Sequence, residues 1–283
     1  MKSKTMFLEN LLKLAKLRIS ISITITALVG YILYINELDI RLLYLFVSVL
    51  ILTIGSASLN QYQEFDTDAL MKRTAKRPIV VGNISPYLAL TVSVTEIGLG
   101  TFLLAYFFDM ATAYVGLSAV ITYNVIYTPL KKITLLSVIA GAVVGAIPPY
   151  IGWVAAGGTL DSIYMLKIAF FLFMWQMPHF WILNILYEKE YKNAGLITLT
   201  RWLNEHQMIR VTYFWILILV FSSLFLWGNL NIYFFINLIY GVYLLYQSLL
   251  IFNQKTEHLR KTFMRINIFV LFILLLLILE KYI

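Results

Sequence analysis

Cysteine is absent from this sequence of 283 residues, and charged residues make up only 13% of it. Without thiols, disulfides, iron–sulfur clusters and thiolate zinc sites are excluded. Hydrophobic residues make up 61% of the sequence, and together with the low content of charged residues this excludes a water-soluble domain of this size. The chain also lacks a polar linker, a low-complexity tract and a Pro- or Gly-rich hinge. We therefore expect a single domain over residues 1–283.

Long apolar segments fill most of the chain, each close to the ~20 residues that a helix needs to cross a bilayer. They predict an all-α, polytopic membrane protein with about nine transmembrane helices. The longer polar connections are Gln61–Ser85, Tyr187–Gln207 and Asn253–Thr262. The expected spans cover residues 17–35, 42–60, 86–107, 110–128, 134–153, 163–186, 209–228, 230–252 and 264–282.

Positive charge collects on one side of these spans. Of the 22 Lys and Arg residues, all but Arg41, Lys167 and Lys281 lie in the N-terminal segment or in alternate loops. Cytoplasmic loops are enriched in Lys and Arg, so we expect a multi-pass protein of the cell membrane with a cytoplasmic N-terminus. A nucleic-acid partner is not expected, because these short loops do not form an extended basic face.

The densest polar cluster follows the second span. If the helix continues there, Asn60, Glu64 and Asp68 recur every four residues and point the same way. Such oxygen ligands, completed by phosphate oxygens and water, suit Mg²⁺. The alternative is a helix end that simply emerges into water, with the basic residues serving topology. The basic residues that would hold phosphate charge follow directly: Lys72, Arg73 and Arg77.

A second cluster, from Trp175 to Phe180, lies inside the sixth span. Pro178 is expected to break the helix pattern there. His179 has three possible roles: a histidine hydrogen-bonded to a neighbour, an axial ligand, or a polar contact to a large ring substrate. Glu190 and Tyr191 follow it in the next loop.

A third feature joins Tyr127, Lys131 and Lys132 to the fifth span. Both lysines fall on the same predicted side as the acidic cluster, within reach of a diphosphate. Gly141 and Gly145 form a small-xxx-small face, which indicates close helix packing.

The stretch from Asn60 to Asp68, with Met71 to Thr74 and Arg77-Pro78, resembles the first acidic motif of the UbiA-type intramembrane prenyltransferases. Together with Trp175 to Phe180, it is similar to the version found in the heme O synthase (protoheme IX farnesyltransferase) subfamily. The resemblance runs from about residue 16 to the C-terminus. Glu64 and Glu190 stand where relatives usually carry aspartate, and the second aspartate-rich motif of relatives is not complete here.

The resemblance implies a helical bundle around a central cavity that opens to the cytoplasmic side. It implies that Mg²⁺, held with diphosphate by Asn60, Glu64 and Asp68, assists ionisation of farnesyl diphosphate. The allylic cation then alkylates a vinyl group of heme b, and water adds to give heme O. Arg73 is grouped with the catalytic residues. The implied substrate-binding residues are Lys72, Arg77, Tyr127, Lys131, Lys132, Trp175, His179, Glu190 and Tyr191.

The sequence is also compatible with two other functions. A related prenyltransferase would act on a quinone precursor or a lipid. A secondary transporter would need a substrate path that reaches both membrane faces, whereas the ionisable residues here cluster at one membrane edge, with no carboxylate relay inside the membrane. For a heme O synthase, the partners would be the lipid bilayer and a heme A synthase or terminal oxidase that receives the product.

Overall fold

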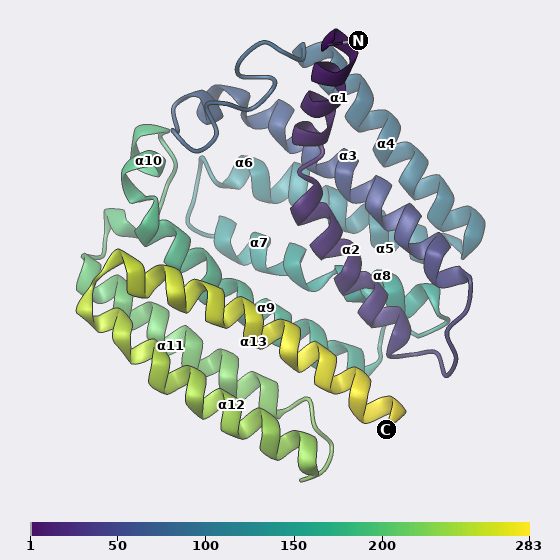
Figure 1. The fold of residues 1–283 in the computed structure, drawn as a ribbon, viewed down its shortest axis with the longest axis vertical. Coiled ribbons are helices and arrows are strands. Elements are labelled where there is room, and N and C mark those ends of the chain that lie inside the picture. The colour runs from purple at the N-terminus through teal and green to yellow at the C-terminus, as the bar shows by residue number, and fades with distance from the viewer. Residues whose placement is uncertain (1) are drawn as a thin grey trace.

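The computed structural model describes residues 2–283, with side chains from Leu8 onward. Within this range helices are the only regular secondary structure, which confirms the predicted all-α class. Figure 1 shows them as a bundle of long, roughly antiparallel rods. The helices are α1 Lys2–Leu14, α2 Leu17–Ile32, α3 Arg41–Ala69, α4 Pro86–Phe107, α5 Met110–Val120, η1 Ile121–Tyr127, α6 Thr128–Leu130, α7 Ser137–Ala146, α8 Pro148–Ala155, α9 Ile163–Leu186, α10 Glu188–Asn193, η2 Leu199–Arg201, α11 Glu205–Leu224, α12 Ile232–Ser248, η3 Leu249–Asn253 and α13 Thr256–Tyr282.

Eight helical segments in the described range are long and apolar enough to cross a membrane. Leu17–Ile32 is shorter, at 16 residues, so a count of nine spans stays a prediction. Large apolar side chains face outward along the bundle; Phe102, Ile239 and Leu271 are 59%, 70% and 62% exposed. Lipid is the natural partner for such a surface, and the chain is a multi-pass membrane protein.

Local signals explain where several helices begin. The Ser85 hydroxyl accepts a hydrogen bond from the Leu88 backbone N–H at 3.2 Å, and Pro86 occupies the first turn of α4. Asn204 and Gln207 form a reciprocal capping box at the start of α11. Such caps satisfy N–H groups that the first turn of a helix leaves without partners.

The predicted polar connections are partly wrong. Helix α3 continues past residue 60 to Ala69, and α13 begins at Thr256 inside the expected third connection. Residues 188–193 of the second connection form α10. A hydropathy pattern marks where a helix leaves lipid, but backbone hydrogen bonding carries the helix on into the polar region.

The expected break at Pro178 is also wrong. Helix α9 runs without interruption from Ile163 to Leu186, with Pro178 buried among its neighbours α7, α11 and α13. The fifth span is the one that divides, at Ile147, where Pro148 begins α8. A proline within a membrane helix is tolerated where neighbouring helices surround it, and Pro178 has such surroundings.

The glycines of the fifth span allow close approach, as predicted. A Cβ at Gly141 would lie 2.8 Å from the Tyr127 ring and 2.9 Å from the Phe180 ring. One at Gly152 would lie 1.8 Å from the Ala27 carbonyl oxygen, where α8 crosses α2. The glycine of α7 therefore brings the two aromatic rings together.

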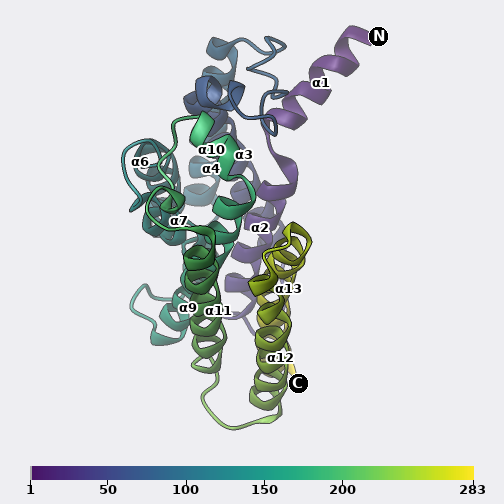
Figure 2. The same cartoon turned by 90° about the vertical axis from the view of Figure 1, so that its left-hand side faces the viewer.

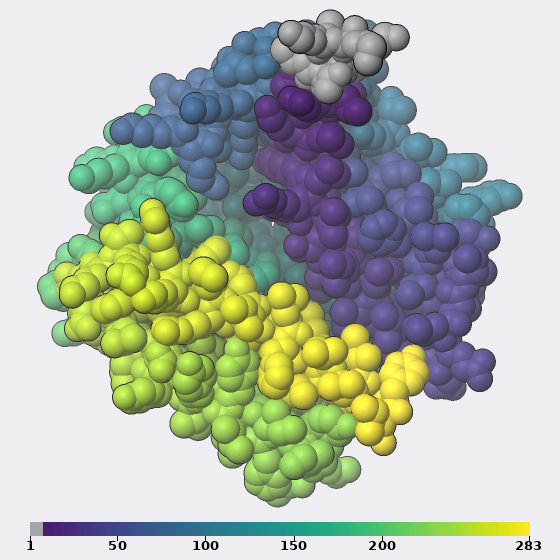
Figure 3. All heavy atoms as spheres, viewed as in Figure 1, coloured from purple at the N-terminus to yellow at the C-terminus, as the bar shows by residue number. Residues whose placement is uncertain are grey.

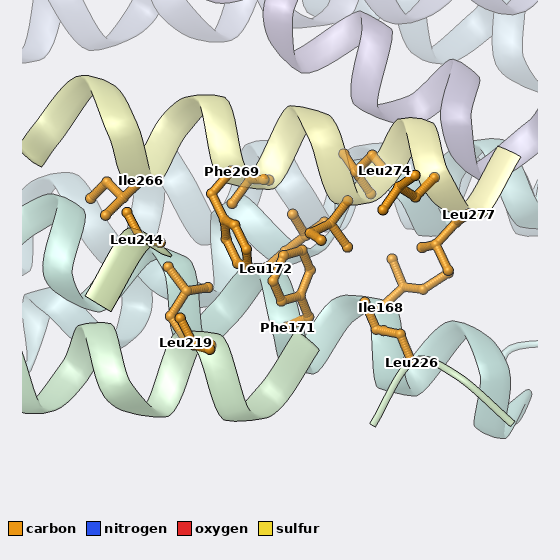
Figure 4. Packing of buried hydrophobic residues seen from close by; sticks show 14 of the residues in the cluster. Ile168, Phe171, Leu172, Leu219, Leu226, Leu244, Ile266, Phe269, Leu274 and Leu277 are labelled. Atoms are coloured by element: carbon orange, nitrogen blue, oxygen red, sulfur yellow. The ribbon is translucent and has the colours of Figure 1, made fainter. Parts of the chain in front are cut away.

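The largest apolar core joins α9, α11, α12 and α13 (Figure 4). Phe171 and Phe269 meet edge to face there, with ring centroids 6.3 Å apart. Helices α2, α3, α4, α5 and α8 pack through a second core on the other side of the molecule. A hollow lies between the two halves, bordered by the purple N-terminal helices, the blue residues after α3 and yellow α13 (Figure 3). Figure 2 shows α1 projecting from the bundle.

Candidate active site

The C-terminal part of α3 carries the predicted amide and the two carboxylates on one buried face, called here the acidic face. Asn60, Glu64 and Asp68 are 2%, 6% and 1% exposed. The Asn60 amide donates a hydrogen bond to the Glu64 carboxylate at 2.9 Å. The helix therefore continues through this cluster with the expected spacing of four residues, and the prediction of one shared face is confirmed.

Every member of this acidic face is met by a basic side chain from elsewhere in the chain. These partners converge from the start of α2, from the segment after α3 and from the end of α6. Burial of carboxylates is costly without such partners. The contacts are Lys16 Nζ to Asn60 Oδ1 at 2.7 Å, Lys131 Nζ to Glu64 Oε1 at 2.5 Å, and an ion pair between Arg77 and Asp68.

Lys16 is a site residue that sequence alone did not identify, because five basic residues of the N-terminal segment all satisfied the topology rule. It adopts a left-handed backbone conformation, with φ 45°, between α1 and α2. This bend directs its side chain to Asn60. Burial and the positive charge of Arg77 lower the pKa of Lys16 to about 7.

The helix opposite the acidic face contains a π-helical segment, η1. Asn124 of η1 is fixed to α3 by hydrogen bonds: its amide donates to the Ser56 carbonyl at 3.0 Å and to Gln63 Oε1 at 3.1 Å. Thr128, directly after η1, accepts from the Asn60 amide at 3.0 Å. The wide π turn thus brings polar groups of this helix onto α3, and such segments often occur at functional sites.

An aromatic row leads away from the acidic face. Lys131 Nζ lies 4.8 Å from the Tyr127 ring centroid while it pairs with Glu64. Tyr127 stacks on Tyr123 at 5.7 Å and lies 6.0 Å from Phe180 of α9. The contacts therefore connect the predicted Tyr127 and Lys131 of the third sequence feature to the second cluster.

The second cluster is assembled with a residue of α13. Trp175 Nε1 donates to Asn267 Oδ1 at 3.2 Å, and His179 Nδ1 lies 3.2 Å from the same oxygen. The His179 ring also lies 4.7 Å from that of Phe263. Asn267 was missed by sequence reasoning, since a lone asparagine in the ninth apolar span carries no periodic signal.

Glu190 and Arg73 meet between the segment after α3 and helix α10. The Arg73 backbone N–H donates to Glu190 Oε2 at 3.2 Å, and its guanidinium carbon lies 4.9 Å from the Tyr187 ring centroid. Burial raises the pKa of Tyr191, and the nearby charge of Arg73 opposes this rise. The predicted Lys72 and Lys132 are exposed instead of joining the acidic face.

The donor set fits a hard cation only if Asn60 takes part. Among the described residues, no group of three His, Cys, Asp or Glu side chains is placed to hold a metal ion. Asn60, Glu64 and Asp68 together provide an amide oxygen and carboxylate oxygens on one buried face, which are ligands of the kind Mg²⁺ prefers. Lys16, Lys131 and Arg77 now engage these oxygens, so cation binding requires them to exchange partners.

The sequence is similar to curated proteins named protoheme IX farnesyltransferase. The one from Christiangramia forsetii is 32% identical over 98% of this chain and 94% of its own length. The one from Geobacter sulfurreducens is 37% identical over 61% of this chain, a match that spans 63% of that relative.

Solved structures share the fold at low sequence identity. A structure of digeranylgeranylglyceryl phosphate synthase has a TM-score of 0.77 at 18% identity, covering 100% of this chain and 99% of that one. A UbiA homolog from Archaeoglobus fulgidus bound to GPP and Mg²⁺ has a TM-score of 0.67 at 15% identity, covering 95% and 99%. The model of the UbiA prenyltransferase family matches residues 23–275. The chain is therefore a membrane-embedded enzyme that belongs to the UbiA prenyltransferase family.

Proposed function

We propose that this enzyme transfers the farnesyl group of farnesyl diphosphate to a vinyl group of heme b and thereby forms heme O. The observation that carries the proposal is the continuous connection between two unlike sites. A buried acidic face at Glu64 is linked through Lys131, Tyr127 and Phe180 to the aromatic surroundings of His179. The names of the curated relatives support this choice of substrates.

The acidic face would bind the diphosphate end. Asn60, Glu64 and Asp68 would hold Mg²⁺, which neutralises charge on the leaving diphosphate when it is bound. The A. fulgidus homolog bound to GPP and Mg²⁺ supports the pairing of a prenyl diphosphate with this metal. Lys16, Arg77 and Lys131 would turn from the acidic face to phosphate oxygens. Exposed basic residues nearby would add further contacts, with Arg residues suited to bidentate ones. They are Lys72, Arg73 and Lys132.

The aromatic row would receive the allylic group. When the C–O bond of farnesyl diphosphate breaks, the electron pair leaves with diphosphate and the positive charge spreads over the allyl carbons. Tyr123, Tyr127, Trp175 and Phe180 would exclude water, and their ring faces favour a cation. The cation forms a C–C bond to the vinyl group, and the new cation beside the porphyrin takes up water and loses a proton. Glu190 and Tyr191 would line the entrance.

The proposed location is the cell membrane, with the acidic face toward the cytoplasm. The one-sided distribution of Lys and Arg in the sequence supports this orientation. Lys72, Arg73 and Arg77 all follow the same end of α3 that carries Glu64 and Asp68. Heme O is apolar and bound for other membrane proteins, so we propose direct transfer to a heme A synthase or a terminal oxidase.

A product analysis tests the function. The purified protein is incubated with heme b, farnesyl diphosphate and Mg²⁺, and the extracted hemes are examined by mass spectrometry. We expect a heme carrying one added farnesyl group and one added hydroxyl group. Parallel reactions with a quinone precursor and with a glycerol lipid serve as controls. Prenylation of either acceptor in place of heme, or liposome flux without any product, would overturn the proposal.

A further inference from the structure

Three polar side chains meet within the membrane where α9 packs against α13. Trp175 and His179 lie one turn apart on α9, and both contact Asn267 of α13. Elsewhere these two helices meet through apolar side chains (Figure 4). Polar groups at this depth are costly unless each finds a partner, so their hydrogen bonds restrict one another.

The orientation of the Asn267 amide follows from its partners. The indole Nε1–H of Trp175 only donates, so the atom facing it at 3.2 Å must be the amide oxygen. The Phe263 carbonyl only accepts, and the Asn267 amide nitrogen donates to it at 2.6 Å. A flipped amide would place two donors together and two acceptors together. Both contacts therefore require the same orientation.

This orientation fixes the proton on the histidine. His179 Nδ1 faces the Asn267 oxygen at 3.2 Å, so Nδ1 must carry the hydrogen. A neutral imidazole has one N–H, which leaves Nε2 with a free lone pair. Metal-binding histidines commonly have this arrangement, in which the second ring nitrogen donates to an oxygen acceptor.

His179 could contact heme through a propionate or through the iron, and the free lone pair on Nε2 favours the iron. A heme propionate is ionised and only accepts hydrogen bonds, so it gains nothing from a nitrogen that also only accepts. Iron is a Lewis acid and binds such a lone pair. His179 is partly exposed, and its ring is bordered by Trp175, Phe180 and Phe263 at centroid distances of 5.3, 5.8 and 4.7 Å.

We propose that Asn267 is a positioning residue that holds His179 as the Nδ1–H tautomer, so that His179 Nε2 ligates the iron of heme b during the transfer. This inference rests on the proposed function. Trp175 has two roles in it: its ring borders the histidine, and its N–H orients Asn267. The ligand and its supporting hydrogen bonds would fix the porphyrin relative to the aromatic row that leads to Tyr127.

The test is a titration of the purified, detergent-solubilised protein with heme b, followed by absorption and resonance Raman spectra. We expect His179→Ala to lose the Soret shift and free imidazole to restore it. Asn267→Leu should weaken heme affinity about 10- to 100-fold, as other losses of supporting partners do. Asn267→Asp keeps an acceptor for Nδ1–H, so it should retain ligation and raise the iron–imidazole stretching frequency of the ferrous complex.

Asn237→Leu is the matched control, because Asn237 is a buried asparagine of α12 that accepts from Ser223 at 3.0 Å. It should leave the heme spectrum unchanged. An unchanged spectrum and affinity in Asn267→Leu would overturn the inference, as would equal loss of heme and farnesyl diphosphate binding. If the wild type farnesylates heme but His179→Ala does not change the heme spectrum, the inference about His179 is wrong and the proposed function still holds. Absence of any farnesylated heme from the wild type would remove the proposed function.

Discussion

Around Glu64 the buried polar groups are charged and paired, whereas around His179 they are neutral and joined by hydrogen bonds. The first region draws its basic partners from three separate segments of the chain. The second region holds Asn267 from both sides. A site of exchangeable ion pairs suits a substrate that brings and removes charge. A fixed neutral site suits a large, flat substrate that must keep one orientation.

The strongest test of this comparison is Asp68→Asn. The change removes a carboxylate from the acidic face and leaves Arg77 without its partner. We expect turnover to fall about 100- to 1000-fold, the usual effect of losing one preorganised electrostatic contact in a transition state. Heme b should still shift its Soret band on binding. Near-normal turnover in this variant would show that Asp68 takes no part in catalysis.

The next effect concerns stability. Lys131→Met leaves the Glu64 carboxylate buried without its ion pair, which typically costs about 3 to 5 kcal/mol. Adding Glu64→Gln should recover much of that loss, because the unpaired charge disappears. Thermal unfolding in detergent measures both variants. Lys132→Met is the control, since this neighbouring lysine is exposed; equal destabilisation by both lysine variants would contradict the ion-pair explanation.

A smaller effect is expected from pH. Lys16, with its pKa lowered to about 7, is half protonated near neutral pH. Bound diphosphate favours the charged form of this lysine. Above about pH 7 the lysine must therefore take up a proton when diphosphate binds. The affinity for diphosphate should fall as pH rises, by at most about tenfold per pH unit. Lys16→Met should remove this dependence, whereas Lys13→Met at an exposed position should keep it. The measurement is the dissociation constant for inorganic diphosphate over a series of pH values. If this constant changes with pH equally in the wild type and in both variants, Lys16 is not the source of the pH dependence.

The smallest effect should come from Arg73→Lys. Arg73 is exposed, and its guanidinium lies over the Tyr187 ring at 4.9 Å. Lysine retains the charge but loses the planar fork and its stacking. We expect KM for farnesyl diphosphate to rise about threefold, in keeping with the modest strength of exposed contacts. Full wild-type kinetics would assign Arg73 to topology alone.

The sequence predicted the two regions but not the contacts that join them. Hydropathy located spans such as Pro86–Phe107 and Ile163–Leu186, because lipid admits only long apolar helices. The spacing of four residues placed Glu64 and Asp68 on one face. The pairing of Lys16 with Asn60 and of His179 with Asn267 depends on packing between segments 44 and 88 residues apart, which periodicity does not encode.

Backbone prediction failed for a related reason. From the sequence alone, Pro148 and Pro178 both predict a break in a helix. In the structure a new helix begins at Pro148, whereas α9 continues through Pro178. The difference depends on what surrounds each residue. Likewise, no residue type in Ile121–Tyr127 indicates a π-helix, since its wide turn is stabilised by the contacts of Asn124 with α3.

Because of this π-helix, the geometry of the active site depends on the number of residues in the segment Ile121–Tyr127. An α-helix advances by about 100° per residue, so deleting one residue from the π turn would turn everything on one side of the deletion by that angle. Asn124 and Thr128, which now both contact α3, would no longer face it together. This helix therefore tolerates exchange of lipid-facing side chains such as Val125 far better than the loss of a single peptide unit, whatever residue is removed.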